Sequence, residues 1–157
     1  YLPVYERSIY IDGNQLVCSC LSPLFQYIES PGSYMAAFRH SRNRCVFTEA
    51  RDVIKRKQDQ EDTVKRQVNK YREEGFPEQF GLVWNGLLVR KHNDVTESLC
   101  RTWNEEVKKG SYRDQLSLMY VLWKYGYEIT VIEDDENKGK RRQFVVACPH
   151  PAMGGGR

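Results

Sequence analysis

Two short polar segments carry the residue types best suited to chemistry. Residues 111–117 (SYRDQLS) place a charged triplet just after Gly110, where we expect the first turn of a helix. Residues 10–14 (YIDGN) form a strand-like run that ends in a carboxylate, a glycine and an amide. A charged triplet is costly to bury as plain core, whereas both segments are well placed to contact a polar ligand.

Asp12 follows Ile9 and Ile11 at the expected C-terminal end of a strand, where open α/β sheets bind their ligands. Its carboxylate, with Asn14 as a second oxygen, would suit Mg²⁺ or Mn²⁺, because these hard cations need few protein carboxylates when diphosphate oxygens complete their coordination. An ordinary Asx-turn is the structural alternative, since Asp-Gly-Asn is also a strong turn sequence.

Asp114 has a functional and a structural interpretation. In the first it accepts hydrogen bonds from sugar hydroxyls, and Arg113 or Gln115 orients it. In the second, Ser111 and Asp114 form an S-x-x-D capping box, in which the carboxylate bonds the cap amide.

A basic cluster lies between an expected strand and a long helix, and contains Arg39, His40, Arg42 and Arg44. Guanidinium groups match phosphate oxygens, so the cluster suits a phosphate-bearing ligand, with a solvated loop as the alternative. We expect the three arginines to differ. At least one should point into a ligand cleft, while the others stay solvated or pair with Glu49 and Asp52.

The composition indicates one folded domain without an internal linker: 157 residues, 40% hydrophobic and 29% charged. No apolar run is long enough to span a bilayer. The net charge of +3 is small and basic residues alternate with acidic ones, so we expect no nucleic-acid partner. The five cysteines lack zinc-site spacing and are expected to be reduced. No P-loop, G-x-G-x-x-G or Ser-His-Asp order is present, which argues against dinucleotide binding and nucleophilic hydrolysis.

Hydrophobic patterning predicts the elements that position these residues. Strands are expected from residue 8 to about 12, at 34–38 and at 82–89, with a bulge or close backbone approach at Gly86. A further pair, 127–132 and 144–147, should form a hairpin. Helices are expected at 22–29, at 48–74 with a possible break at 59–62, from Asp94 or Thr96 to Gly110, and from Ser111 to Gly126. This order predicts an α/β three-layer sandwich with a mixed sheet.

Five segments in register resemble one known family: 38–50 (FRHSRNRCVFTEA), 71–77 (YREEGFP), 88–93 (LVRKHN), 103–106 (WNEE) and 113–117 (RDQLS). The family is the glycosyltransferase-like domain of plant mucilage and turgor-regulation proteins, which also has bacterial and viral relatives. The resemblance covers about residues 8–125. It implies a GT-A-like fold that transfers a sugar from a nucleotide diphosphate.

The resemblance also implies roles for single residues. Asp12, Gly13 and Asn14 match the D-x-D-like metal motif, with asparagine in place of its second acid, and His150 resembles the late histidine that completes the metal shell. The Arg113-Asp114-Gln115 segment matches the acidic motif at a helix start that contacts the donor sugar. The residues implied on the donor side are Arg39, His40, Arg42, Trp84 and Asn85. The upstream strand and loop that hold the nucleotide base in GT-A domains are missing here, and the chain starts at Tyr1 without methionine, so we expect a segment of a longer protein.

The sequence therefore predicts a glycosyltransferase-like domain over residues 1–150, followed by a flexible tail at 151–157. It would use Mn²⁺ or Mg²⁺, a nucleotide-diphospho-sugar donor and a glycan or other hydroxyl acceptor, with Asp114, Arg113 and Gln115 at the catalytic centre. The alternative is a non-catalytic module that binds a glycan or protein. We expect a cytoplasmic location, with a lumenal domain of a longer protein as the alternative.

Overall fold

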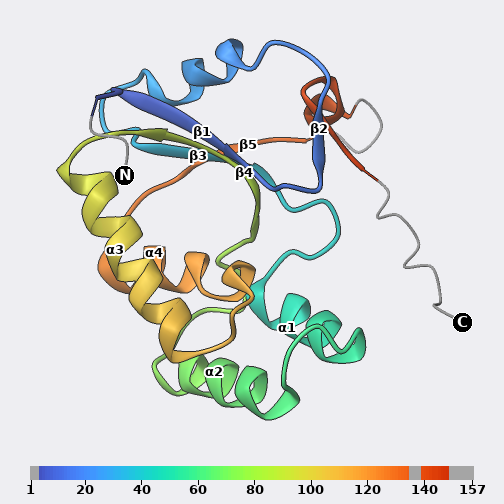
Figure 1. Cartoon of the computed structure of the whole chain (residues 1–157). Helices are drawn as coiled ribbons and strands as arrows, with labels where there is room; N and C mark the ends of the chain where they lie inside the picture. The colour runs from blue at the N-terminus through green and yellow to red at the C-terminus, as the bar shows by residue number, and fades with distance from the viewer. Residues whose placement is uncertain (1–3, 135–138, 149–157) are drawn as a thin grey trace, which may run out of the picture.

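The computed structural model describes residues 4–134 and 139–148 and has an α/β fold (Figure 1). Its strands are β1 (Arg7–Ile11), β2 (Gln15–Val17), β3 (Met35–Arg39), β4 (Val83–Lys91), β5 (Thr130–Ile132) and β6 (Val145–Ala147). The α-helices are α1 (Val46–Lys55), α2 (Glu61–Glu73), α3 (Asp94–Lys109) and α4 (Leu118–Tyr125). Three 3₁₀ helices complete it: η1 (Ser22–Ile28), η2 (Asp114–Leu116) and η3 (Lys140–Gln143).

The main sheet is mixed, as predicted, with the strand order β1-β4-β3-β5. Strand β4 is antiparallel to both β1 and β3, while β3 and β5 are parallel. The C-terminal ends of β1, β3 and β5 therefore lie at the same end of the sheet, where β4 begins. Ligands of α/β sheets bind at the carboxyl ends of the strands. Asp12 follows β1, which is an edge strand of this sheet and not the central strand that the metal-motif interpretation required.

Strand β4 carries the predicted bulge. Ala37 of β3 pairs with Leu88, but the next residue, Phe38, pairs with Trp84, so three residues of β4 have no partner on β3. Gly86 lies in this bulge, and a Cβ atom there would overlap the indole ring of Trp84. The absence of a side chain at Gly86 therefore lets Trp84 fold back over its own strand.

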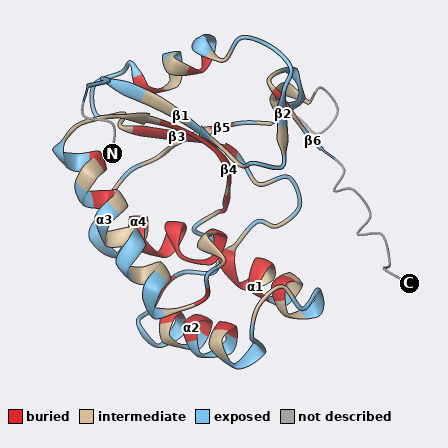
Figure 2. Cartoon of the chain, viewed as in Figure 1, coloured by how far each residue is buried: buried red, intermediate tan, exposed pale blue. Residues whose placement is uncertain are grey.

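Two apolar cores cover the two faces of the sheet. The larger core joins residues such as Met35, Ala37 and Leu88 to the α-helices, all of which lie on one side of the sheet in Figure 1. The smaller core joins Phe38 and Val89 to η1 on the other side. Figure 2 shows the buried residues concentrated on β3, β4 and α4. Helical segments thus lie on both sides of the sheet, as the three-layer prediction expected.

The expected hairpin between residues 127–132 and 144–147 is wrong. Strand β5 joins β3 in the main sheet, and β6 pairs with β2 in a separate two-stranded sheet. Ile132 and Val145 are both buried in the smaller core. Each strand therefore pairs with a different partner. The β-branched composition of the two runs predicts strands but does not reveal these partners.

The helical segment expected at 48–74 contains a break, as the possible break at 59–62 allowed: residues 56–60 divide it into α1 and α2, and Lys57 there has a positive φ of 53°. Two other helices differ from expectation. The cap of α3 is Asn93, whose side chain accepts a hydrogen bond from the Thr96 N–H. The segment at 22–28 is a 3₁₀ helix with Pro23 in its first turn.

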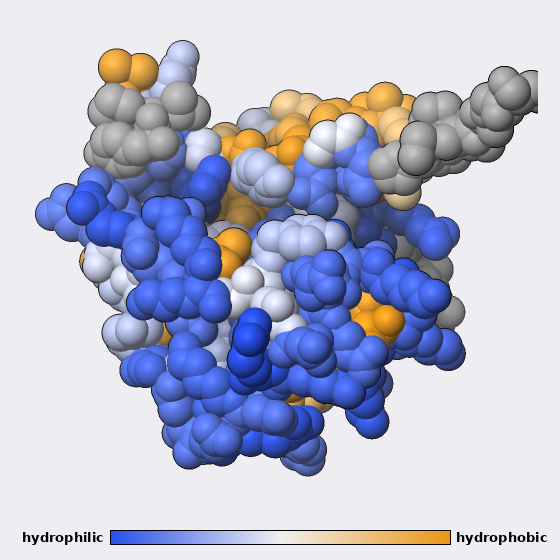
Figure 3. Space-filling view, turned by 60° about the horizontal axis from the view of Figure 1, so that its bottom comes forward, coloured by the Kyte–Doolittle hydropathy of each residue, from blue (hydrophilic) through white to orange (hydrophobic). Residues whose placement is uncertain are grey.

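Surface features agree with the composition. Hydrophilic side chains cover most of the helical side of the molecule in Figure 3, with small apolar areas between them. All five cysteines lie in the described part of the chain and are free thiols. Within residues 4–134 and 139–148, no helix combines the length and apolar character needed to cross a membrane.

Candidate active site

The segment before Asp114 is held by the helical layer and not by a capping box. The Ser111 N–H donates to Oε1 of Gln67 at 2.8 Å, and the Ser111 hydroxyl donates to Asp59. A Cβ atom on Gly110 would lie 2.7 Å from the Gln67 side chain, so glycine is required for this close approach. Because Gln67 takes the Ser111 amide, the structural alternative for Asp114 is wrong. Asp114 opens the short η2 turn and not a regular α-helix.

Asn85 connects Asp114 to the bulge of β4. The Asn85 Nδ2 group donates to Oδ2 of Asp114 at 3.3 Å, and the Asn85 backbone N–H donates to Oε1 of Gln115 at 3.1 Å. The Gln115 Nε2 group donates in turn to the carbonyl of Val83. Gln115 therefore fixes η2 against β4, which is a positioning role, and Asn85 and Asp114 contact each other.

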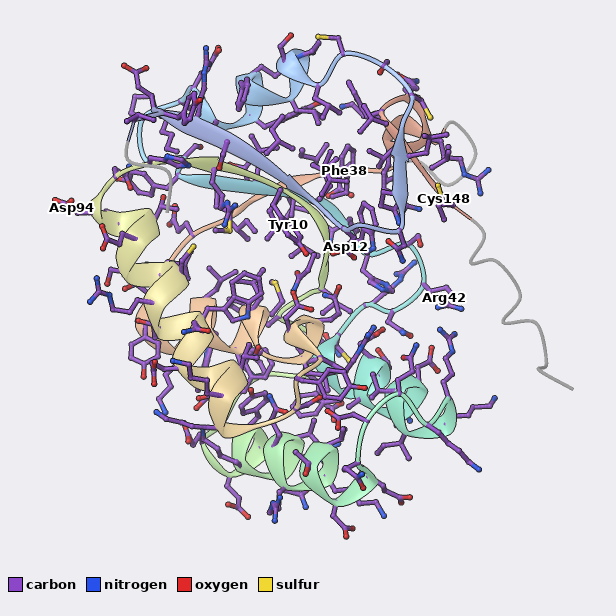
Figure 4. The ribbon with its side chains drawn as sticks, in the orientation of Figure 1. Tyr10, Asp12, Phe38, Arg42, Asp94 and Cys148 are labelled. Atoms are coloured by element: carbon purple, nitrogen blue, oxygen red, sulfur yellow. The ribbon has the colours of Figure 1, made fainter. Side chains whose placement is uncertain are left out.

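Asp12 lies beside this pair. Its backbone N–H donates to the carbonyl of Gly86 at 3.0 Å, which ties the end of β1 to the bulge. Its Oδ1 accepts a hydrogen bond of 2.8 Å from the Tyr10 hydroxyl. Figure 4 shows Tyr10 and Asp12 on the side of the sheet that faces the α-helices. We call Asp12, Asp114 and Asn85 the carboxyl cluster.

The pKa values of Asp114 and Tyr10 are raised by burial, by hydrogen bonding and by neighbouring negative charge. Burial raises the pKa of the Asp114 carboxyl above its usual range, and the charge of Asp12 raises it further, while the hydrogen bond from Asn85 and the charge of Arg113 oppose the shift. The hydrogen bond to Asp12, partial burial and the charges of both aspartates raise the pKa of Tyr10 to about 12. Tyr10 therefore stays a hydrogen-bond donor at neutral pH, and the site favours a cation or a proton.

Two residues next to Asp114, Asn85 through its hydrogen bond and Arg113 in the chain, each have a buried polar atom without a hydrogen-bond partner within the described residues. The atoms are Oδ1 of Asn85, a residue only 4% exposed, and Nε of Arg113. A buried polar atom without a partner costs free energy, so such atoms need an explanation. The Asn85 oxygen is an acceptor that a hydroxyl group of a ligand could satisfy.

A cavity of about 720 Å³ opens at the end of β3, and we call it the β3-end cavity. Its walls include Arg39, His40, Arg44, Gly81, Leu82 and Asp134. Leu82 and Asn85 are three residues apart, so about 10 Å of backbone separates this cavity from the carboxyl cluster. A diphosphate in the cavity could therefore present its sugar near Asp114.

The three arginines differ, as predicted. All three are exposed, but Arg39 and Arg44 line the β3-end cavity, whereas Arg42 does not and points away from the body of the protein in Figure 4. Arg39 makes two hydrogen bonds of 2.7 and 2.6 Å to Glu133, which hold the pKa of that carboxyl below its usual range. Within the described residues Arg44 has no ion pair, so it is the cavity cation best able to take a new anion.

Of the two outcomes expected for the arginines outside the cleft, solvation holds for Arg42, while Asn43, and not one of the three arginines, bonds both Glu49 and Asp52. Its Nδ2 donates to Glu49 at 2.6 Å and to Asp52 at 3.1 Å. The Asn43 backbone N–H donates to Nδ1 of His40 at 2.9 Å. Burial lowers the pKa of His40, so a neutral ring orders this loop. Asn43 thereby leaves Arg44 available to the cavity.

The other sequence-predicted site residues are dispersed. Trp84 belongs to the smaller core, and Arg141 lies over its ring at 4.3 Å, so it faces away from Asn85 and Asp114. The Asn14 amide oxygen accepts from Nε2 of Gln15 in an exposed turn, and no contact with Asp114 is found within the described residues. His150 lies outside the described residues.

Tyr10 is the site residue that sequence reasoning missed. It lies two positions before Asp12, and side chains two apart on a strand share a face. Alternation along residues 8–12 was therefore the signal that could have placed Ser8, Tyr10 and Asp12 together. Ile9 and Ile11 pack against the smaller core on the opposite face.

Asp12 is the residue best suited to bind a divalent ion. Carboxylate oxygens are hard ligands, and the charge of Asp12 contributes to the raised pKa values of both Tyr10 and Asp114. Among the described residues, no three His, Cys, Asp or Glu side chains are arranged to hold a metal ion. The fit to Mg²⁺ or Mn²⁺ therefore requires most ligands to come from diphosphate oxygens and water.

Comparison with known proteins identifies the family. Residues 1–150 match the family model described as TOD1/MUCI70, glycosyltransferase-like domain. Searches of curated proteins and of solved structures found no significant match. The matched region contains both segments of the candidate site, residues 10–14 and 111–117. The chain therefore belongs to the TOD1/MUCI70 family of glycosyltransferase-like domains.

Proposed function

We propose that this domain transfers a sugar from a nucleotide-diphosphate donor to a hydroxyl group of a glycan acceptor. The observation that carries the proposal is the carboxyl cluster: Asp114, with a raised pKa, lies close to Asp12 and bonds Asn85, whose buried Oδ1 lacks a partner within the described residues. Family membership supports a transferase-related function. The edge where β1, β3 and β5 end is also the expected position for a ligand of this sheet.

Asp114 acts as the base in this proposal. It takes the proton of the acceptor hydroxyl while that oxygen forms a bond to the anomeric carbon and the bond from this carbon to the phosphate oxygen breaks. A base works best when its pKa is close to the working pH, and burial moves the pKa of Asp114 in that direction. The hydrogen bond from Asn85 and the fixation of η2 by Gln115 orient the carboxylate.

Asp12 would hold Mn²⁺ or Mg²⁺ together with the donor diphosphate. The bound ion would neutralise charge that develops on the leaving diphosphate. The Tyr10 hydroxyl orients the Asp12 carboxylate through its hydrogen bond. Arg44 and Arg39 place positive charge in the β3-end cavity, where the donor phosphates would lie.

A panel of nucleotide sugars tests this function directly. We expect at least one member of the panel to raise the melting temperature in the presence of Mn²⁺, and removal of the metal to abolish the shift, because binding to the folded state stabilises it. The same donor should then show transfer or slow hydrolysis by mass spectrometry. Glycan binding without any metal-dependent donor binding would instead support a non-catalytic binding module.

Reversal of the cavity charge gives a more specific prediction. Arg44→Glu should weaken binding of the nucleoside diphosphate by about 10-fold or more, because a charge-assisted contact is lost and a repulsive one replaces it. Arg42→Glu is the matched control, since Arg42 is exposed and does not line the cavity. Calorimetry at two salt concentrations would measure both variants. If both substitutions weakened binding of the nucleoside diphosphate equally, the basic cluster would act only through its general surface charge and not through a specific contact of Arg44.

A further inference from the structure

A second pocket lies at the opposite end of β1 from Asp12. It has a volume of about 290 Å³, and its walls include Ser8, Arg90, Lys91, Thr96, Arg101 and Asn104. These residues come from β1, β4 and α3. The volume is at the lower end of the range for ligand pockets, which is about 300–1,000 Å³, so the pocket suits one sugar ring better than a nucleotide. We call it the Arg90 pocket.

Arg90 has hydrogen-bonding capacity that the described residues do not use. Its Nε is buried and has no hydrogen-bond partner in residues 4–134 and 139–148. No ion pair of Arg90 is found in this part of the chain either. A guanidinium group without an acceptor is a site for a carboxylate, sulfate or phosphate oxygen.

Positive charge predominates in this pocket. Arg90 and Arg101 contribute two cations to its walls, against the single carboxylate of Glu97, while the side chain of Lys91 belongs to the opposite face of β4. Glu97 accepts a hydrogen bond of 2.8 Å from Arg101, so it neutralises the exposed arginine and leaves the charge of Arg90. The pocket therefore favours an anionic ligand.

The Arg90 pocket shares a strand face with the carboxyl cluster. Ser8 is paired directly with Arg90, and Tyr10 with Leu88, so these four side chains share the face that lies toward the helices. Tyr10 bonds Asp12 on one side, and the charge of Arg90 reaches it from the other. Ser8 and Asp12 are four residues apart, a span of about 13 Å along the strand. A short oligosaccharide could cover that span.

We propose that the Arg90 pocket binds the anionic group of a sugar in the acceptor glycan, a few sugar units away from the hydroxyl that reacts. This inference rests on the proposed transferase function, because it assigns the far end of the acceptor site. The unused guanidinium Nε and the uncompensated charge would select an acidic glycan over a neutral one. The donor would occupy the other end of the face, at Asp12 and the β3-end cavity.

Binding of a uronic-acid trisaccharide to the whole chain, measured by calorimetry without nucleotide sugar, tests the inference. We expect Arg90→Gln to weaken this binding by about 10-fold or more, the size expected for a lost charge-assisted contact. The carboxyl-reduced trisaccharide should bind weakly to both proteins. Arg51→Gln, on the exposed surface of α1, is the matched control and should bind like the unmodified protein.

Salt dependence provides a second test that requires no variant. Affinity of the unmodified protein for the acidic trisaccharide should fall as NaCl increases, because salt screens the charges, whereas affinity for the neutral one should not. Equal binding of the two trisaccharides would overturn the inference, and so would inorganic phosphate that binds as tightly as the acidic trisaccharide. Either result leaves the proposed transfer reaction standing, because the donor panel tests that reaction separately.

Discussion

Replacement of Asp114 by asparagine is expected to leave the fold intact and to lower the rate of sugar transfer by about 100-fold or more. Asparagine can still accept the hydrogen bond from Asn85 that Asp114 accepts at 3.3 Å. It cannot take a proton from an acceptor hydroxyl. Steady-state kinetics should therefore show the loss in kcat with little change in donor affinity.

Asp94→Asn is the matched control for this variant. Asp94 is exposed in the first turn of α3 and should tolerate the same change without loss of rate. A stable Asp114→Asn protein with near-normal turnover would contradict the role of Asp114 as a base. It would leave the residue only its structural contacts with Asn85 and with the backbone N–H of Gln115.

The unmodified protein and the Asp114→Asn variant should differ in how their stability depends on pH. Because the pKa of Asp114 is raised in the folded state, the folded protein binds this proton more tightly than the unfolded chain does. This contribution to stability is fully present below the unfolded-state pKa, which is about 3.9, and is lost as pH rises through the folded-state pKa. Urea unfolding at several pH values should show this dependence in the unmodified protein and not in Asp114→Asn.

Replacement of Asp12 by asparagine should have the second-largest effect, a loss of at least about 10-fold in Mn²⁺-dependent donor binding. In the metal-free protein it should also lower the pKa of Asp114, because the charge of Asp12 helps to raise it. The pH range over which Asp114 affects stability would then move to lower pH. Calorimetry with Mn²⁺, and urea unfolding at several pH values without metal, would measure the two effects separately.

Asn14→Ala is the control that separates the two members of the D-x-D-like motif. The Asn14 amide is bonded to Gln15 in an exposed turn, so its loss should change metal-dependent binding less than the loss of Asp12. Equal losses of metal-dependent binding from the two substitutions would contradict the assignment of the metal to Asp12 alone. They would indicate that Asp12 and Asn14 bind the metal together. An unchanged dependence of stability on pH in metal-free Asp12→Asn would contradict the charge coupling between Asp12 and Asp114.

The sequence predicted the local elements of the site because local chemistry determines them. The run of isoleucine and tyrosine at residues 9–11 predicts a strand before Asp12, and Gly13 supplies the turn after it. An interior glycine at Gly86 predicted the bulge that the register between β3 and β4 confirms. The α/β class with a mixed sheet followed from the order of these elements.

Pairing and capping could not be predicted reliably, because their partners are distant in the chain. The capping box at Ser111 was wrong because Gln67, 44 residues away, takes the amide. The hairpin of residues 127–132 and 144–147 was wrong because the two runs pair with different strands, β5 with β3 and β6 with β2. Likewise Trp84 and Asn85 are neighbours in sequence, but strand geometry turns them to opposite faces of the sheet.

By itself, the sequence determined the α/β class, the family and the two polar segments, since these depend on residue type and short-range spacing. Only the tertiary structure decided that Asp12 and Asp114, 102 positions apart in the sequence, share one site. The bulge of β4 brings them together, because Gly86 bonds Asp12 while Asn85 bonds Asp114. Burial and the charge of Asp12 then raise the pKa of Asp114, a property that exists only when residues from β1, β4 and η2 are packed against one another.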